Sequence, residues 1–240
     1  MDQPRAAARL IAARLKPPGE SVRIAGEEAA HARARRLCPG DSVVLIDGSG
    51  REAGGRIERF AKAALDVAVL WVRAAPEQGQ AATLFVCGVR PERLDWIAEK
   101  ATELGAARLV LVASERSQAF RASPSRAARL ARVVREAAKQ CESARWPEVS
   151  GPVELAGALS EPFAHRFFLD FDAAPFPASL PPAAAALLVG PEGGWSVSER
   201  AQARASGWTP VSLPAGKLRA ETAALAGLVL LRAAFVSAPV

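Results

Sequence analysis

The feature that most constrains the fold is a regular alternation of short apolar runs and amphipathic helical segments between residues 83 and 235. Parallel strands need long crossover connections, which are usually helices, so this alternation is typical of a parallel sheet with helices on both faces. The sequence therefore predicts an α/β fold for this part of the chain. The runs expected to form strands are residues 83–89, 108–113, 167–171, 185–189 and 211–213.

The helical segments between these runs carry their own start and stop signals. Pro91 suits the first turn of a helix, and Gly105 suits its end. Ser196 and Glu199 have the S-x-x-E spacing of a capping box, and Gly207 follows at the expected end of that helix. A last helix is expected over residues 220–235. A longer helix should begin at residues 123–124, with an inner face of Leu130, Val133, Val134, Ala137 and Cys141.

The first 75 residues have a different pattern. Short runs at residues 42–46, 56–60 and 65–72 predict strands, and the first run ends in the turn-forming sequence Asp-Gly-Ser-Gly. A break rich in Ala, Gln, Pro and Gly lies near residues 74–80. We therefore expect two domains, a compact β-barrel over residues 1–75 and the α/β domain over residues 80–240.

The chain is basic, and this narrows its partners. It has 31 Lys and Arg against 25 Asp and Glu, a net charge of +6 and a pI near 9.9. Such a balance fits a polyanion such as nucleic acid, because each phosphate contact releases counterions. The excess of Arg over Lys is equally typical of a GC-rich genome. Residues 1–40 and 114–145 are the most basic stretches.

The sequence gives little support for a metal site, a disulfide framework or a membrane-spanning segment. The three cysteines, Cys38, Cys87 and Cys141, form no CxxC pair, so we expect no metal site and no disulfide framework, and we expect each cysteine to be buried. No apolar stretch is long enough to span a membrane, and the first residues lack a signal-peptide pattern. The expected location is the cytoplasm.

Two glycine-bearing loops are the candidate ligand site. Residues 190–194 (Gly-Pro-Glu-Gly-Gly) follow the fourth expected strand, and residues 213–219 follow the fifth. In an open α/β sheet, ligands bind beyond the carboxyl ends of the strands, so two such loops could enclose one cofactor. The alternative is that both are ordinary tight connections. Neither loop matches G-x-G-x-x-G or the P-loop pattern.

Several segments in order resemble the ribosomal RNA small-subunit methyltransferase E family. They are L-V-G-P-E-G-G-W-S at residues 188–196 with Glu199, L-R-A-E-T-A at 218–223, K-A-T-E-L-G at 100–105, S-E-R-S at 114–117 and A-K-Q-C at 138–141. The resemblance implies a SPOUT methyltransferase: an N-terminal PUA-like RNA-binding β-barrel, and a C-terminal α/β domain with a deep trefoil knot. It also implies a homodimer, S-adenosylmethionine (SAM) as cofactor, and methylation of N3 of a uridine in 16S ribosomal RNA. The expected partner is that RNA or the small ribosomal subunit, with no membrane and no metal.

The resemblance also implies site residues. The expected cofactor contacts are Leu169, Val189, Gly190, Pro191, Glu192, Gly193, Gly194, Leu213, Gly216, Leu218, Arg219 and Thr222. Arg219 is the first candidate for stabilising charge on the uracil ring, with a salt bridge to Glu221 or phosphate anchoring as the alternative; Glu192 would act as a base or only brace its loop. The expected RNA contacts are Arg9, His31, Arg36, Arg116, Gln140 and Arg145.

The chain departs from the family pattern in the second loop. Where the family has L-G-x-R-[IV]-L-R, Pro214 replaces the glycine, Gly216 the arginine and Lys217 the aliphatic residue. Proline fixes φ and removes an N–H, so the backbone that faces the cofactor could differ. Three alternatives therefore stay open: another SPOUT activity on tRNA or on a ribose 2′-hydroxyl, a non-catalytic RNA-binding ribosome assembly factor, or a metabolic α/β enzyme.

Overall fold

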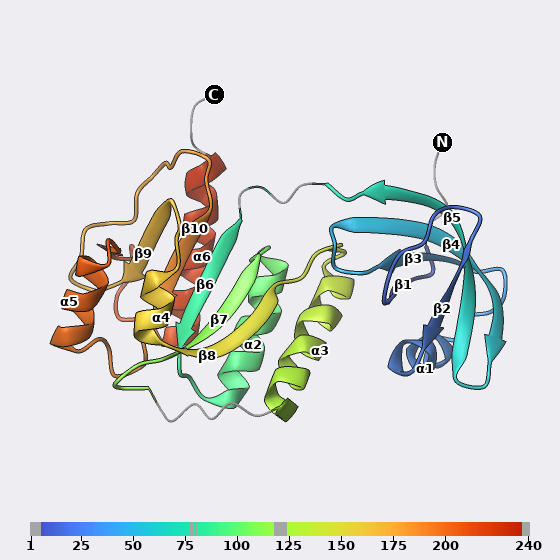
Figure 1. Cartoon of the computed structure of the whole chain (residues 1–240), viewed down its shortest axis with the longest axis horizontal. Coiled ribbons are helices and arrows are strands. Elements are labelled where there is room, and N and C mark those ends of the chain that lie inside the picture. The colour runs from blue at the N-terminus through green and yellow to red at the C-terminus, as the bar shows by residue number, and fades with distance from the viewer. Residues whose placement is uncertain (1–5, 77–78, 80, 118–123, 237–240) are drawn as a thin grey trace. The chain divides into compact units, whose positions relative to one another are not determined.

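A computed structural model describes residues 6–76, 79, 81–117 and 124–236 (Figure 1). The chain forms two compact units. The first comprises Met1–Glu77 together with Ala138–Trp146, and the second comprises Gln78–Ala137 and Pro147–Val240. The sequence pattern gives no sign that residues 138–146 belong with the first unit.

The first unit is a five-stranded sheet with one short helix. Strand β3 (Ser42–Ile46) has the predicted bounds, and β4 (Arg51–Ala61) and β5 (Ala64–Ala74) extend the two other predicted strands. The sheet order is β1-β3-β4-β5-β2, with β1 parallel to β3 and the other pairs antiparallel. Strands β1 (Ala8–Ile11) and β2 (Ser21–Ala25) and helix α1 (Glu27–Ala34) were not expected from the sequence. Four or five residues in a strand, or eight in a helix, are too few for a clear period.

Alternation of buried and exposed side chains builds the core of this unit. In β2, Val22 and Ile24 are buried between exposed neighbours. They join Leu10 of β1, Leu45 of β3 and Leu65 of β5 in one apolar cluster. Side chains of a strand alternate between the two faces of the sheet, so one face is apolar and the other carries charge. The charged face can therefore meet a polar partner while the fold stays intact.

The second unit is a six-stranded sheet in which every pairing is parallel, as predicted. Its order is β11-β9-β10-β6-β7-β8. The strands are β6 (Ala82–Cys87), β7 (Arg108–Ala113), β8 (Glu148–Glu154), β9 (His165–Leu169), β10 (Ala185–Val189) and β11 (Thr209–Val211). The helices are α2 (Pro91–Glu103), α3 (Pro124–Gln140), α4 (Leu155–Ser160), α5 (Val197–Ala205) and α6 (Ala220–Val236).

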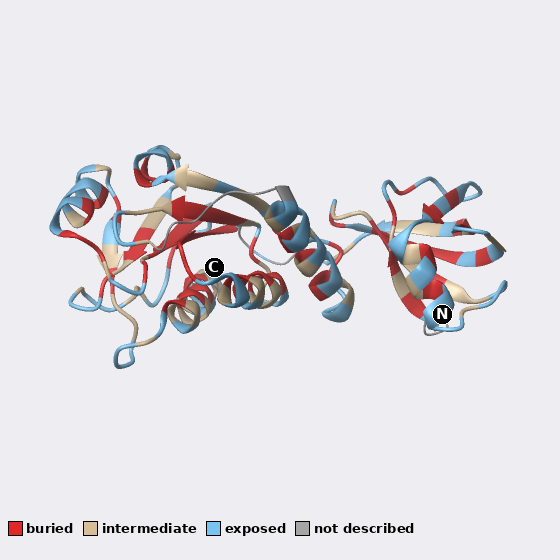
Figure 2. Cartoon of the chain, turned by 90° about the horizontal axis from the view of Figure 1, so that it is seen from below, coloured by how far each residue is buried: buried red, intermediate tan, exposed pale blue. Residues whose placement is uncertain are grey.

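Helices cover both faces of this sheet. Leu155 of α4 and Ala203 of α5 share one apolar cluster with Phe85, Phe168 and Leu188 of the strands. The opposite face packs against α6, which contacts β6 and β10 and runs beside α2 (Figure 1). Figure 2 shows the result as a buried sheet between helices whose outer faces are exposed.

The structure differs from the prediction for two edge strands and one helix of this unit. Strand β8 and helix α4 were not expected, and the last strand lies at Thr209–Val211 rather than at residues 211–213. Both strands contain proline, Pro152 in β8 and Pro210 in β11, which obscures a strand pattern. They are the two edge strands of the sheet, the position where a missing N–H is tolerated.

The cysteine prediction was right for one residue and wrong for two. Cys87 is buried in β6, and burial raises the pKa of its thiol to about 12. Cys38 and Cys141 are exposed. Cys141 does not extend the buried face of α3, because the helix ends at Gln140 and Glu142 takes a positive φ of 56°. The start of that helix at Ser123 lies outside the described residues.

Close approach of α6 to the sheet depends on Gly227. A Cβ atom added there would lie 2.6 Å from Leu187 Cδ2 and 3.3 Å from Leu169 Cδ1. Leu187 is fully buried in β10, so it has little room to move. The helix can therefore lie this close only with glycine at the contact.

We predict that Gly227→Val lowers the free energy of unfolding by about 2 kcal/mol, because a larger side chain overpacks the core at this contact. Gly157→Val is the matched control, since Gly157 also lies in a helix but has open space around its Cβ position. Urea denaturation of both variants measures the difference. Equal stability of the two would contradict the tight packing of α6.

Candidate functional site

A cavity of about 510 Å³ lies beyond the carboxyl ends of β9, β10 and β11. Three segments wall it: residues 169–171 after β9, residues 189–195 after β10 and residues 211–218 after β11. Both glycine-bearing loops thus border one pocket, at the place where open α/β sheets bind ligands. The predicted cofactor residues that line it are Leu169, Val189, Gly190, Pro191, Glu192, Gly193, Gly194, Leu213, Gly216 and Leu218.

The backbone of the first loop lies over an indole ring. A Cβ atom on Gly190 would come within 2.8 Å of Trp195 Cε2, so only glycine leaves space for the ring. Trp195 is buried, donates from Nε1 to the Leu169 carbonyl at 2.8 Å, and meets Phe168 edge to face at 6.2 Å. Gly194, with φ of 68°, closes the turn by donating its N–H to the Pro191 carbonyl at 2.8 Å. Trp195 therefore holds the loop after β10 against the end of β9.

The buried carboxylate of Glu199 fixes the far end of this loop. The predicted capping box is present: Ser196 Oγ accepts from the Glu199 N–H at 3.1 Å, and the Ser196 N–H donates to Glu199 Oε2 at 2.8 Å. The other oxygen, Oε1, accepts the Glu115 N–H at 2.8 Å. Glu199 is only 3% exposed, and both its oxygens are satisfied by backbone N–H groups. One carboxylate therefore joins the loop after β10 to the turn after β7.

That turn, Ser114–Ser117, supports the pocket from outside. Ser198 Oγ donates to Glu115 Oε1 at 2.8 Å, and these hydroxyl bonds from Ser198 and Ser196 lower the pKa of Glu115. Arg116, a predicted RNA contact, donates from Nη1 to the Gly193 carbonyl at 3.1 Å. The structure therefore gives Arg116 a contact with the glycine loop itself.

An ion-pair network that was not predicted from the sequence lies beside the glycine-bearing loop of the main cavity. Arg93, in the first turn of α2, donates from Nη1 to Glu192 at 2.6 Å and to Glu221 at 2.9 Å. It joins the loop after β10 to the first turn of α6. The alternative pairing of Arg219 with Glu221 is not formed. Arg219 is exposed and makes no ion pair with any residue that the structure describes.

Arg219 and Thr222, the remaining predicted cofactor residues, do not line the main cavity. They line a neighbouring groove together with Lys217 and Leu218, which border both spaces. Asp170 and Arg200 were also missed: Arg200 lines the main cavity and donates to buried Asp170 at 3.0 and 3.3 Å. The signal that could have found Asp170 is its position directly after strand β9, on the edge that carries both loops. Arg93 lies in the first turn of α2 and has no such local signal.

The other predicted RNA contacts lie in the first unit. His31 is on α1, exposed Arg36 has a positive φ of 58°, Gln140 ends α3, and exposed Arg145 lies against Gly50. Arg9 is half-buried and pairs at 3.1 Å with the buried Glu52, a carboxylate that it shares with Arg73.

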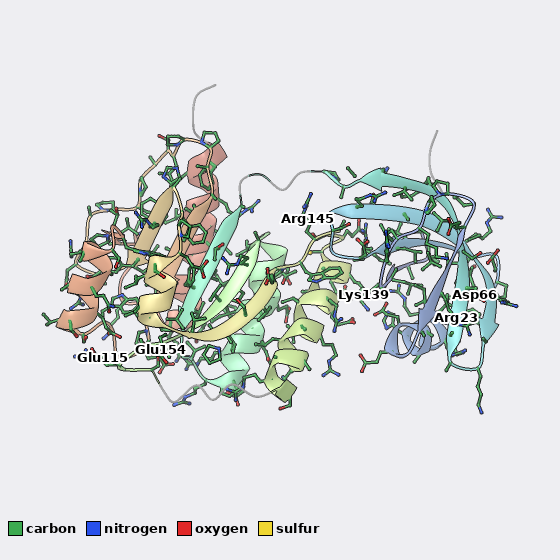
Figure 3. The ribbon with its side chains drawn as sticks, viewed as in Figure 1. Arg23, Asp66, Glu115, Lys139, Arg145 and Glu154 are labelled. Carbon is green, nitrogen blue, oxygen red and sulfur yellow. The ribbon has the colours of Figure 1, made fainter. Side chains whose placement is uncertain are left out.

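Further ion pairs organise the charged surface of this unit. Figure 3 labels Arg23 and Asp66, which face each other on β2 and β5 at 3.5 Å, and Arg59 also pairs with Asp66 at 2.7 Å. Lys139, labelled with Arg145 in the same figure, pairs with Glu28 at 2.7 Å. Because Asp66 and Glu52 each pair with two arginines, both clusters keep an excess of positive charge.

Neither a metal-ligand cluster nor a membrane-spanning helix occurs in the described ranges. No group of three or more His, Cys, Asp and Glu side chains there could hold a metal ion. Within the same ranges, no helix has the length and apolar character needed to cross a bilayer.

Comparisons with known proteins agree with this arrangement. Residues 76–232 match the family described as "RNA methyltransferase domain", and residues 24–69 match the "RNA methyltransferase PUA domain". The class is therefore that of RNA methyltransferases with an N-terminal PUA domain.

Curated relatives narrow the class. The chain is 32% identical over 234 residues to the ribosomal RNA small subunit methyltransferase E of Mycobacterium tuberculosis, covering 89% of this chain and 87% of that one. It is 30% identical over 213 residues to the Synechocystis protein of the same name, covering 84% and 69%. The chain belongs to the ribosomal RNA small subunit methyltransferase E family.

Solved structures support the fold along the whole chain. A methyltransferase from Legionella pneumophila, determined with SAM, has a TM-score of 0.86 at 26% identity and covers 96% of this chain and 98% of that one. An RNA methyltransferase from Thermotoga maritima has a TM-score of 0.73 at 30% identity, covering 94% and 98%. The α/β domain with a PUA-like unit is thereby confirmed, while the trefoil knot stays a prediction.

We predict that Glu199→Gln lowers the free energy of unfolding by about 2 kcal/mol, because an amide NH₂ would face one of the backbone N–H groups that the carboxylate now accepts. The matched control is Glu154→Gln, since Glu154 is the exposed residue before α4 and makes no side-chain capping bond. Thermal denaturation compares the two. A control as destabilised as the Glu199 variant would argue against a special role for the buried carboxylate.

Proposed function

We propose that this protein transfers the methyl group of SAM to N3 of a uridine in 16S ribosomal RNA. The observation that carries the proposal is the single cavity walled by both glycine-bearing loops at the carboxyl ends of β9, β10 and β11. The SAM-bound structure from Legionella pneumophila, which shares this fold, supports SAM as the ligand.

The residues present fit a nucleoside cofactor. The volume of the cavity is within the range of small-molecule sites. Leu169, Val189, Leu213 and Leu218 offer apolar surface for a purine ring. The loop at residues 190–194 offers backbone N–H and carbonyl groups, because its glycines leave them uncovered.

The departures from the family pattern do not close the cavity. Gly216 and Lys217 line it, and a Cβ atom on Gly216 would meet nothing within 4 Å. The loop thus remains a wall of the pocket despite Pro214. This favours a methyltransferase over a non-catalytic assembly factor that has lost its cofactor site.

When bound, SAM supplies an electrophilic methyl group, and the residues of the chain must position donor and acceptor and stabilise charge. A uracil that loses its N3 proton carries negative charge on its carbonyl oxygens. We assign the stabilisation of that charge to Arg219, whose guanidinium is exposed directly before the N-terminus of α6. The helix N-terminus adds positive potential at the same place.

Glu192 has a different role in this proposal. Its carboxylate is held by Arg93 at 2.6 Å, and the same guanidinium holds Glu221. An ion-paired carboxylate would have to give up its partner before it could accept a proton. We therefore assign Glu192 to bracing the loop after β10.

For RNA we assign the exposed groups of the first unit, Arg36, Gln140 and Arg145, as contacts with the phosphate backbone. Residues 24–69 match the PUA domain of RNA methyltransferases, which supports this assignment. Homodimerisation and a cytoplasmic location follow from the family resemblance and from a ribosomal substrate, and both are part of the proposal.

We predict that purified protein with SAM methylates small-subunit ribosomal RNA at a uridine N3, and that Arg219→Ala slows the transfer by about 100-fold. Calorimetry should show an unchanged Kd for SAM in this variant, because Arg219 lies outside the main cavity. Mass spectrometry of digested RNA identifies the modified position. Methylation of a ribose hydroxyl or of tRNA alone would favour another SPOUT activity, and no binding at millimolar SAM would favour the assembly factor.

We also predict that Gly193→Val weakens SAM binding by more than tenfold and leaves the fold intact. Gly193 lines the cavity, and a Cβ atom there would already lie 3.3 Å from Arg116 Cβ, so a valine must shift the loop that forms this wall of the pocket. Gly157→Val, in α4 and away from the cavity, is the control for SAM affinity. An unchanged Kd for SAM in the Gly193 variant would place the cofactor elsewhere.

A further inference from the structure

The charged face of the five-stranded sheet in the first unit has more cations than anions. Residues that stand opposite each other on neighbouring strands share a face, and the buried residues Val22, Leu45 and Leu65 belong to the apolar face. The charged strand residues of the other face are five arginines and three carboxylates: Arg9, Arg23, Arg56, Arg59 and Arg73 against Glu52, Glu58 and Asp66. Such an excess suits a polyanionic partner.

One arginine of this face is held flat by its neighbours. The guanidinium of Arg73 lies over the indole ring of Trp71, 4.8 Å from the ring centroid, and its Nε donates to Glu52 Oε1 at 2.7 Å. Glu52 is buried and also pairs with Arg9, so one carboxylate holds two guanidinium groups. The side chain of Arg73 is 57% exposed, which leaves the other plane of its guanidinium open to a ligand.

The indole ring beneath this guanidinium is fixed as well. Trp71 stands opposite Gly54 on the neighbouring strand β4, and a Cβ atom on Gly54 would overlap the ring. The ring therefore lies across the backbone of β4, in a space that only glycine leaves. Backbone, indole and guanidinium form three layers, so Arg73 is ordered before a ligand arrives. Such ordering lowers the entropic cost of binding.

An ordered and exposed guanidinium is a surface on which a planar base can stack. Proteins that recognise single-stranded RNA place unstacked bases on aromatic rings or on arginine planes, whereas bases inside a duplex are covered by their neighbours. The exposed residues Arg23, Arg56 and Arg59 share the face with Arg73, and Figure 3 labels Arg23 beside Asp66. A flat cation on a face with excess positive charge fits a nucleic acid, because the base and the phosphates each find a partner.

We propose that this face binds single-stranded RNA, with one unpaired base stacked on Arg73 and neighbouring phosphates in contact with Arg56 and Arg59. The inference rests on the proposed RNA substrate and extends it. The contacts assigned under that proposal, Arg36, Gln140 and Arg145, lie outside the strands of this sheet. The stack on Arg73 adds recognition of a base to recognition of the phosphate backbone.

The test separates stacking from charge. Oligouridylate and an abasic sugar–phosphate oligomer of the same length are titrated against wild-type protein and Arg73→Lys, which keeps the charge and removes the plane. We expect Arg73→Lys to weaken binding of oligouridylate by about tenfold and of the abasic oligomer by less than about twofold. The dependence of Kd on salt should stay the same, because the number of phosphates neutralised is unchanged.

Two further variants support this comparison. Trp71→Leu removes the layer beneath the guanidinium and should reproduce the pattern of Arg73→Lys, while Trp71→Phe keeps a ring and should recover most of the affinity. The matched control is Arg14→Lys, since Arg14 is exposed after β1 and has no ring partner among the described residues. It should leave both Kd values unchanged.

The other outcomes overturn the proposal. Equal losses on both oligomers would mean that Arg73 contacts phosphates only, and no binding of oligouridylate by the wild-type protein would reject the RNA surface as a whole. If circular dichroism shows Trp71→Leu to be unfolded, Arg73→Lys decides alone, because that side chain is largely exposed. A protein that methylates RNA but gives equal losses rejects this surface alone. The predicted stacking pattern without methyl transfer rejects the proposed function alone.

Discussion

The architecture of the site depends on one buried carboxylate. Glu199 accepts hydrogen bonds from the N–H groups of Ser196 and Glu115, which lie on segments about eighty residues apart in sequence. A buried carboxylate is stable only when its oxygens are satisfied, so the two segments must meet in one arrangement. The loop that lines the cavity begins at Gly190 and ends at this anchor. Its shape is therefore set from outside the pocket, and a ligand can enter an already formed wall.

Two other side chains also hold the walls of the cavity by polar contacts between segments that are distant in sequence. Trp195 ties the loop to the carbonyl of Leu169, and Arg93 ties Glu192 to the first turn of α6. Each contact joins two segments that lie at the carboxyl edge of the sheet. Such ordering before binding lowers the entropic cost of holding a cofactor. It also explains why polar residues of the family motif, such as Glu199, are buried in the framework and do not face the cavity.

Sequence alone predicted those parts of the molecule whose signals are local. The capping box at Ser196 and Glu199, the strands at Arg108–Ala113 and Ala185–Val189, and both glycine-bearing loops each follow from a few adjacent residues. The edge strands β8 and β11 were missed or displaced, because Pro152 and Pro210 interrupt their pattern and their pairing is decided by the sheet. Arg93 could not be recognised from local signals, since its partners Glu192 and Glu221 are remote in sequence. The joining of residues 138–146 to the first unit is likewise a matter of tertiary contact.

Some cations of this chain have partners within the fold, and others near the cavity have none among the described residues. A basic sequence suggests that any arginine can contact RNA, yet Arg9, Arg93 and Arg116 are occupied by Glu52, by two carboxylates and by a backbone carbonyl. These three arginines therefore serve to fix the fold and the loop around the cavity. Arg219 and Lys217 border the cofactor cavity or its neighbouring groove without such partners among the described residues. The guanidinium of Arg219 stands at the start of a helix and is not used by the fold, which is why we propose it as the group that stabilises negative charge developing on the substrate.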